Sequence, residues 1–413
     1  MSSTRAARRQ KSTVQPYFPA FLTQRAAQVI LAFGMGIESS SILCRWLLDP
    51  TSRGFSLDDL TVVTAMVGDE FSDTGQLVTA HILPLLRRYN VRYVQVARGG
   101  PSFSDGYVVL DDSRQPTTLH LRGHYKLSDE LLAAGTVPQV AHGKRICSAK
   151  HKGWVLDQWI SANFNAVPYR HAIGFNRDEV KRIDRDNCYG EAGVRFPFHP
   201  LMEWNWSRED AWSYIMRTLN VSWKRSQCSF CCFSNGNPAV LERFRELPEA
   251  GLKALLIERL SLSLNERMTL YSSKSLYSCL RTDDNRALLD EFESTLDRIE
   301  YKLYRVRRVI HSRRVTHRKV EGIAAGSRSE MAEMLAHRAE TEGIPLSHEA
   351  DIPRLYLKRR APGLYPDTEE MIVAAPALAV DKGRASFERS WARVAQQFYQ
   401  VPSPVQIERS AAA

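Results

Sequence analysis

The chain has 413 residues, of which 44% are hydrophobic and 25% charged, a composition typical of a globular protein with two or three domains. No uninterrupted run of about 18 apolar residues occurs, so we expect no membrane span. The basic N-terminus lacks the apolar core of a secretory signal, and we therefore expect a cytoplasmic location.

The net charge of +10 is concentrated in two segments. Residues 1–25 hold five basic and no acidic residues, whereas Arg298–Lys319 carries +8, which leaves −3 for the rest. Residues 1–25 are expected to be disordered, because they combine low hydrophobicity with excess charge. The basic segment Arg298–Lys319 suggests DNA or RNA as a partner, although a solvated helix face would give the same pattern.

Residues 26–240 alternate short apolar runs with helical patterns. Strands are expected at residues 28–33, 60–68, 91–99 and 169–175, and helices at 40–50, 77–90, 151–164 and 207–220. Strands that alternate with helices predict a parallel sheet covered on both faces. The predicted fold class is therefore α/β, with a doubly wound, mostly parallel, Rossmann-like sheet.

The chain after Pro238 contains no predicted strand. Residues 239–268 and 285–315 have a helical period, so residues 241–320 are interpreted as a helical basic region. Residues 321–413 are expected to form a linker and C-terminal helices, the last of them over residues 386–400. The sequence thus predicts a helical C-terminal extension.

The segment "GMGIESSS", Gly34–Ser41, stands where the first strand should pass into the first helix. Gly34 and Gly36 would let the backbone approach an anion and adopt conformations closed to other residues, and the helix N-terminus would offer unpaired N–H groups. The segment has no lysine, which excludes a Walker A loop, and Ser39 replaces the third glycine of a dinucleotide fingerprint. A pyrophosphatase loop and a plain tight turn both remain.

Three carboxylates follow the second predicted strand, at Asp69, Glu70 and Asp73. In a doubly wound sheet this edge lines the ligand crevice, and Mg²⁺ held by carboxylate and phosphate oxygens would fit there. An acidic loop that caps a helix is the alternative.

The cysteines form two groups. Cys147 is surrounded by Lys144, Arg145, Lys150, His151 and Lys152, which would favour its thiolate or bind phosphate or sulfate. Cys228, Cys231 and Cys232 form a cluster with one C-x-x-C pair. Three or four thiolates that meet across a fold suit an iron–sulfur cluster, and zinc is less favoured because zinc ribbons use two such pairs. Redox or persulfide thiols and structural packing are the alternatives.

Several of these segments resemble the phosphoadenosine phosphosulfate (PAPS) reductase-like branch of the adenine-nucleotide alpha-hydrolase, or PP-loop pyrophosphatase, family of phages and bacteria. The matching segments are "FGMGIES", "RICSAKHK", "GFNRDEVKR", "PLMEWNWSR" and "SQCSFCCF", which are spread over Val29–Phe233, about half of the chain. The sequence departs from the family pattern at Met35 and Ile37 in the loop, and at Cys232, where members usually carry proline.

The resemblance implies an adenine-nucleotide site and a reactive centre. The implied nucleotide-binding residues are Gly34, Gly36, Glu38, Ser39, Ser40, Asp69, Thr74, Gly174 and Glu179. The implied catalytic residues are Cys147, Lys152, Arg145 and Arg182. The implied ligands of a four-iron, four-sulfur cluster are Cys147, Cys228, Cys231 and Cys232.

The expected function is that of an enzyme acting with ATP or PAPS/APS and Mg²⁺. It would adenylate a substrate and transfer sulfur to it, or reduce an adenylylated sulfate, with nucleic acid as the modified substrate and a cysteine desulfurase as a sulfur donor. No "ECGxH" segment occurs, which disfavours a thioredoxin-dependent PAPS reductase. The alternative is a non-catalytic nucleic-acid-binding or regulatory protein with a degenerate nucleotide site.

Overall fold

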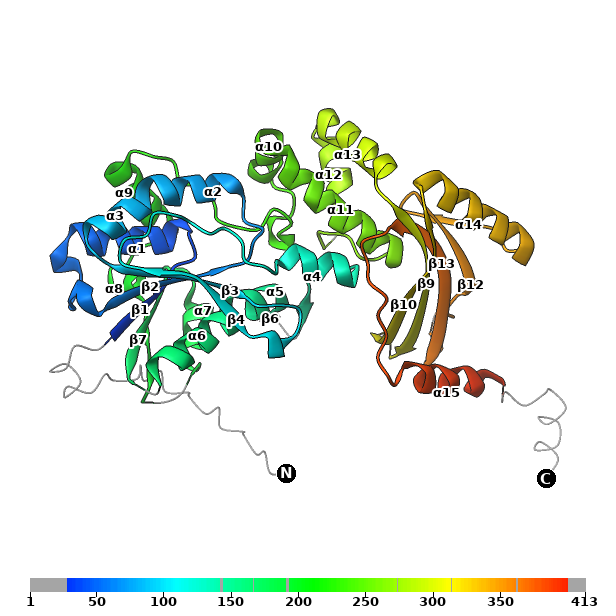
Figure 1. The fold of residues 1–413 in the computed structure, drawn as a ribbon, viewed down its shortest axis with the longest axis horizontal. Coiled ribbons are helices and arrows are strands. Elements are labelled where there is room, and N and C mark those ends of the chain that lie inside the picture. The colour runs from blue at the N-terminus through cyan, green and yellow to red at the C-terminus, as the bar shows by residue number, and fades with distance from the viewer. Residues whose placement is uncertain are drawn as a thin grey trace, which may run out of the picture. The chain divides into compact units, whose positions relative to one another are not determined.

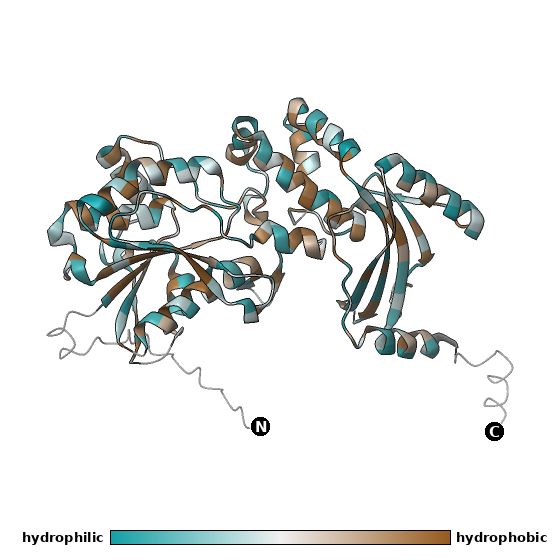
Figure 2. Ribbon diagram, viewed as in Figure 1, coloured by the Kyte–Doolittle hydropathy of each residue, from teal (hydrophilic) through white to brown (hydrophobic). Residues whose placement is uncertain are grey.

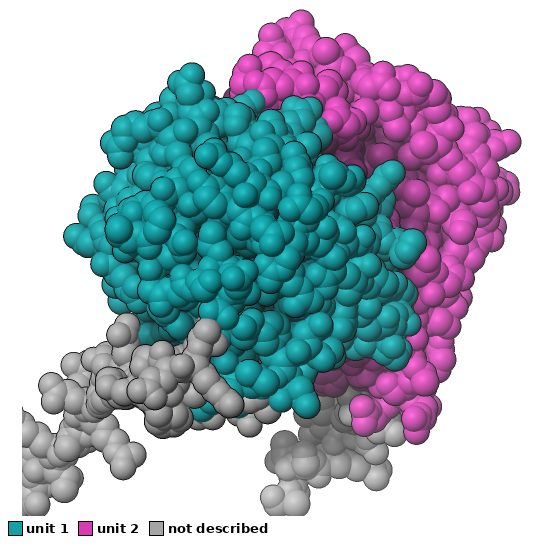
Figure 3. Space-filling model, turned by 60° about the vertical axis from the view of Figure 1, so that its left-hand side comes forward, with its two compact units in different colours: residues 1–127, 147–228 teal, residues 128–146, 229–413 magenta. Residues whose placement is uncertain are grey.

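The computed structural model describes residues 28–141, 144–165, 167–190, 193–272, 274–312, 314–361 and 363–399. The tail over residues 1–25, expected to be disordered, lies outside this range. The chain divides into two compact units (Figure 3): unit 1 covers residues up to 127 and 147–228, and unit 2 covers 128–146 and the residues from 229 on. No helix in the described ranges has the length and apolar character needed to cross a bilayer.

Unit 1 contains a six-stranded sheet with the order β4-β3-β2-β1-β7-β8 (Figure 1). Its strands are β1 (Gln28–Ala32), β2 (Leu60–Met66), β3 (Arg92–Arg98), β4 (Tyr107–Ser113), β7 (Tyr169–Ile173) and β8 (Arg195–Phe198). All neighbours are parallel except β3 and β4. The prediction of a mostly parallel α/β sheet is confirmed, although β4 and β8 were not predicted.

Helices cover both faces of this sheet. They are α1 (Ile37–Leu48), α2 (Ser72–Leu77), α3 (Leu83–Arg88), α6 (Trp154–Phe164), α7 (Val180–Asn187), α8 (Pro200–Glu203) and α9 (Arg208–Leu219). Alternate residues of β1 face opposite sides, so that Leu31 packs in the cluster with Trp46 of α1 and Ile30 in the cluster with Trp159 of α6. Every residue of β2 is buried, as expected for a parallel strand covered on both faces. Figure 2 colours much of this sheet as hydrophobic.

Unit 2 is not the helical extension that the sequence predicted. It contains a five-stranded antiparallel sheet with the order β10-β9-β13-β12-β11. Its strands are β9 (Tyr301–His311), β10 (Arg314–Gly326), β11 (Ser347–Glu349), β12 (Ile352–Lys358) and β13 (Asp367–Pro376). The prediction of helix over 285–315 is correct only for α13 (Arg286–Arg298). The linker prediction for residues 321–413 is wrong, because strands and a long helix occupy most of this range.

The helices of unit 2 are α4 (Leu127–Ala134), α10 (Pro238–Glu246), α11 (Pro248–Leu264), α12 (Leu276–Thr282), α13, α14 (Arg328–Glu342) and α15 (Phe387–Tyr399). Of these, α11, α14 and α15 pack against the sheet, whereas α10, α12 and α13 pack against α11. The end of α11 shares a core cluster with Val306 and Met371, whereas α14 shares another with Leu303 and Ile372. Three short elements lie close to Cys147 in the sequence: β5 (Val140–Ala141), β6 (Lys144–Arg145) and α5 (Ile146–Ser148).

Candidate functional site

The candidate site lies at the edge of the unit 1 sheet where the parallel strands end. The strand β1 has β2 on one side and β7 on the other, so the strand order reverses at β1. In open α/β sheets, ligands bind outside the carboxyl ends of the strands at such a reversal. The turn Gly34–Gly36 follows β1, and Gly174 follows β7, so both turns lie at this point.

The glycine turn does not use its glycines for unusual backbone conformations. Met35, between them, has the left-handed φ of +57°, and its side chain is buried in the core. A left-handed conformation costs a non-glycine residue about 1 kcal/mol or more. Gly34 has no heavy atom within 4 Å of the place where a Cβ would stand, and Gly36 has only ordinary contacts there. The expectation that these glycines adopt conformations closed to other residues is therefore wrong, and Gly34 instead leaves open space above the turn.

The first turn of α1 presents unsatisfied donors. Gly36 is the N-cap residue and supplies no side-chain cap, so the first N–H groups of the helix have no intrahelical acceptor. Ser39 Oγ donates to the Gly36 carbonyl at 3.2 Å, and Ser41 Oγ to the Glu38 carbonyl at 2.8 Å. Ser40 Oγ is buried and makes no hydrogen bond within the described ranges. The backbone amides, more than the hydroxyls, are available to an anion.

Two further residues shape this helix start. The Glu38 carboxylate accepts a hydrogen bond from Arg208 Nη1 at 2.5 Å, which balances its negative charge beside the helix N-terminus. A Cβ on Gly174 would stand 3.0 Å from the Ser39 nitrogen and 3.1 Å from Glu38 Cβ. The loop after β7 therefore approaches α1 this closely because residue 174 has no side chain.

The segment Trp223–Cys228 connects the glycine turn with the loop after β2. Trp223 Nε1 donates to the Met35 carbonyl at 3.1 Å, and Ser226 Oγ donates to the Gly34 carbonyl at 3.0 Å. The backbone of Cys228 forms an isolated antiparallel bridge with Glu70. Sequence reasoning did not identify Trp223 or Ser226 as site residues, although both lie within a stretch that carries the family resemblance.

A lysine, a glutamate and two thiols gather at the same edge. Lys152 Nζ lies 3.2 Å from Glu70 Oε1, and the Glu70 side chain is fully buried while that of Lys152 remains 34% exposed. Burial lowers the pKa of the Lys152 ammonium, but Glu70, Cys228 and Cys147 outweigh it and raise the pKa above its ordinary value. Lys152 therefore stays protonated beside two partly exposed thiols, an environment that favours thiolates.

Two predicted nucleotide contacts are buried. Asp69 keeps 2% of its surface and Thr74 none. Both follow β2 at the site edge, so they position this loop and are not exposed to a ligand in this conformation. The third carboxylate of the loop, Asp73, pairs with Lys224 at 3.6 Å.

The remaining predicted residues do not join this group through any described contact. Arg182 pairs with Glu179 and covers the Phe175 ring at 4.3 Å. Arg145 belongs to unit 2, where its guanidinium covers the Phe233 ring at 3.9 Å.

The four predicted cluster ligands are divided between the two units. Cys147 and Cys228 belong to unit 1, and Cys231 and Cys232 to unit 2. Within the described ranges, no three His, Cys, Asp or Glu side chains are arranged to hold a metal ion. The side chains as placed thus do not form a ready cluster or Mg²⁺ site, and both cofactors stay predictions.

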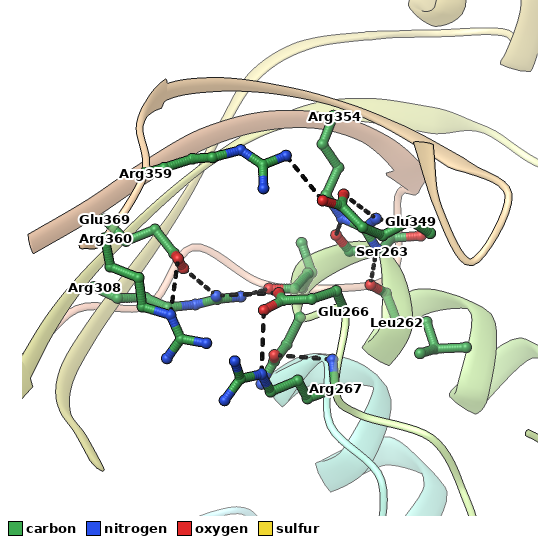
Figure 4. Close-up of polar contacts among 12 residues, drawn as sticks. Leu262, Ser263, Glu266, Arg267, Arg308, Glu349, Arg354, Arg359, Arg360 and Glu369 are labelled. Atoms are coloured by element: carbon green, nitrogen blue, oxygen red, sulfur yellow. Dashed lines mark hydrogen bonds and ion pairs between the residues drawn. The ribbon is translucent and has the colours of Figure 1, made fainter. Parts of the chain in front are cut away.

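The basic segment Arg298–Lys319 is mostly strand, and much of its charge is already paired. On β9, Arg305 pairs with Glu370, and Arg307 pairs with Glu321 and Glu388. Figure 4 shows buried Arg308 reaching Glu369 and Glu266. The prediction of a helix over this segment is wrong, and these arginines do not form an exposed basic face.

A buried polar network joins β7, β8 and α7. Arg195 Nε donates to His171 Nδ1 at 2.9 Å, and Arg195 Nη2 donates to Asp186 at 2.6 Å. Burial lowers the pKa of His171 to about 3, and the Arg195 cation acts in the same direction. Burial would raise the pKa of Asp186, but His199 and Arg195 hold it below its ordinary value. This network is part of the core, and its titration makes stability depend on pH.

Comparison of the chain with models of protein families, with curated proteins and with solved structures found no match.

Proposed function

We propose that the protein is a PAPS reductase-like enzyme that binds ATP or PAPS/APS at this sheet edge and carries out sulfur chemistry there. The observation that carries the proposal is the segment Trp223–Cys228. It contacts the glycine turn at one end and the Glu70 loop at the other, so a phosphate-binding turn and two thiols share one edge.

The phosphate end of the nucleotide would rest on the first turn of α1. The uncapped N–H groups and the helix dipole favour an anion, and the open space above Gly34 admits one. Phosphoryl and nucleotidyl transfer need positioning and charge neutralisation more than covalent help. Arg208 offsets the negative charge of Glu38, and the Lys152 ammonium supplies positive charge beside the thiols.

The thiols would provide the sulfur chemistry. In one form of the reaction, an acceptor is adenylated with release of pyrophosphate, a persulfide carried on one thiol displaces AMP, and the second thiol frees the thiolated acceptor as the two cysteines form a disulfide. In the other, an adenylylated sulfate is reduced to sulfite, which leaves the nucleotide as the two thiols are oxidised to a disulfide. Cys147 and Cys228 lie with Lys152 and are the residues that we assign to this role. An iron–sulfur cluster would bring electron-transfer chemistry, but no step here depends on it.

A second candidate is a non-catalytic, nucleic-acid-binding or regulatory protein. It is favoured by Glu38, whose carboxylate oxygen comes within 3.5 Å of the Cβ position of Gly36 and so places a negative charge at the helix start. A carboxylate there competes with a bound phosphate.

One experiment on the full chain distinguishes the two candidate functions. Pyrophosphate release from ATP is measured with and without DNA or tRNA, together with equilibrium binding of ATP and PAPS. We expect nucleotide binding in the wild type, and retained binding in Cys147→Ser and Cys228→Ser, because the thiols act only in the later sulfur chemistry. A protein that neither binds nor cleaves these nucleotides would overturn the enzyme proposal.

The cluster prediction has its own test. The protein is purified without oxygen, and its iron content and visible absorbance are compared with those of Cys228→Ala and Cys231→Ala. Loss of iron in both variants would support the cysteines as ligands, whereas iron content that does not change would remove that assignment.

A further inference from the structure

A cavity of about 280 Å³ lies within unit 2, among α11, α12, α13 and the start of α14. Its wall combines apolar side chains with hydroxyl groups. The apolar members include Leu255, Leu262 and Phe292, and the hydroxyl groups come from Ser275, Tyr277 and Ser278. This volume is slightly below the range of about 300–1,000 Å³ that is usual for small-molecule sites, so it suits a small ligand.

Three arginines on three helices line this cavity: Arg259 of α11, Arg281 of α12 and Arg328 of α14. Arg328 is held by Glu293 at 3.0 Å and Asp297 at 2.9 Å. In the part of the chain that the structure describes, no carboxylate forms an ion pair with Arg259 or Arg281. Glu258, Glu293 and Asp351 also line the cavity, so Arg259 and Arg281 face it near carboxylates but without an ion pair among the described residues.

One of these carboxylates, Glu258, is already engaged by backbone donors. Its buried carboxylate accepts hydrogen bonds from the backbone N–H groups of Leu270 at 2.8 Å, Leu276 at 2.8 Å and Tyr277 at 3.1 Å. Burial lowers the pKa of the Arg259 guanidinium, and the Arg328 cation lowers it further, while Tyr301 and Glu293 act in the opposite direction. A cation held beside apolar surface in this way gains from an anion.

We infer that this cavity binds a small phosphate monoester, whose phosphate pairs with Arg259 and Arg281 while its organic part packs on Phe292 and Leu255. Guanidinium groups bind phosphate oxygens in pairs, and a phosphate monoester near neutral pH carries close to two negative charges, which matches the two arginines. The hydroxyls of Ser275 and Tyr277 offer further donors, whereas that of Ser278 already donates to the Ser275 carbonyl at 2.8 Å. The inference concerns unit 2 alone and does not rest on the proposed function.

The test uses the full chain with phenyl phosphate and inorganic phosphate as probes, at constant ionic strength, in calorimetric titration and thermal unfolding. We expect saturable binding of phenyl phosphate that is tighter than that of inorganic phosphate, and at least about tenfold weaker in Arg259→Gln and Arg281→Gln. Arg286→Gln, an arginine that is 82% exposed and pairs with Asp284, should bind as the wild type does.

A purely structural role for Arg259 predicts a different result. If Arg259 only stabilises the fold, Arg259→Gln melts at a lower temperature than the wild type without phosphate. If Arg259 binds an anion, the variant melts at the same or a higher temperature, and phenyl phosphate no longer raises its melting temperature as it does in the wild type. Absence of saturable binding, or binding that persists in Arg281→Gln but is lost in Gly34→Ala, would overturn the inference.

Discussion

The two units use charged side chains in opposite ways. In unit 1, Glu38, Glu70 and Lys152 lie beyond the C-terminal ends of parallel strands, where several loops converge. In unit 2, arginines lie on the strands themselves, and Arg308 of β9 stands directly opposite Glu369 of β13 in the antiparallel register. A high density of charge along the sequence therefore does not identify a binding surface, because cross-strand partners neutralise it.

The largest expected effect is in unit 2, where the pairing is buried. Arg308→Leu should lower the free energy of unfolding by about 3–5 kcal/mol, because it leaves Glu369 buried with only the 3.7 Å contact to Arg360 and removes the hydrogen bond to the Leu264 carbonyl. Urea unfolding followed by circular dichroism measures this. Arg298→Gln, in an exposed pair with Glu291, is the matched control and should change stability by less than about 1 kcal/mol.

Buried His171 should make the stability of unit 1 depend on pH. Its pKa of about 3 lies below the ordinary value of about 6.5, so between these values the unfolded chain binds a proton that the folded chain does not. Stability should therefore fall as the pH is lowered through this range, by up to about 1.4 kcal/mol per pH unit. His171→Asn should flatten this slope.

Tryptophan fluorescence is a suitable probe for this prediction, because only Trp391 among the eight tryptophans belongs to unit 2. His124→Asn changes an exposed histidine of unit 1 and should leave the slope as it is. An equal slope in the wild type and in His171→Asn would contradict the assignment of the pH dependence to this buried histidine.

A smaller effect is expected where the two turns of unit 1 meet. Gly174→Ala would place a Cβ at 3.0 Å from the Ser39 nitrogen, and the resulting displacement of α1 should cost about 1–3 kcal/mol. Chemical unfolding and nucleotide binding are both measured. Binding that is weakened together with stability would agree with the close packing of these turns, whereas a variant as stable as the wild type would contradict it.

The fold of unit 1 could be predicted because its signals are local. Short apolar and β-branched runs such as β2 (LTVVTAM), and the capping box in which Ser207 and Asp210 exchange hydrogen bonds, indicate their structure within a few residues. Unit 2 could not be predicted in this way. Helix α13 ends at Arg298 and strand β9 begins at Tyr301, so the sequence shows no break between the helical pattern and the strand. The glutamates that pair with the arginines of β9 lie about 60 residues further along the chain.

The candidate site was predictable in part. Gly34, Gly36, Glu38, Ser39 and Gly174 lie together at the start of α1, and their nucleotide contacts stay a prediction. The contacts of Trp223 and Ser226 with the glycine turn span 188 and 192 residues, and no local pattern indicates them. The strained residue was also misplaced, because left-handed conformations are expected at glycine, whereas here Met35 adopts one and is held there by its buried side chain.

The central claim is that the turn after β1 binds the phosphates of an adenine nucleotide. Calorimetric titration of ATP into the wild type, Gly34→Ala and Gly54→Ala tests it most directly, since neither glycine has any heavy atom within 4 Å of its Cβ position. We predict that all three proteins have the same stability, that Gly54→Ala binds as the wild type does, and that Gly34→Ala binds at least about tenfold more weakly. Equal ATP affinity in the two variants, or no binding by the wild type, would contradict the account.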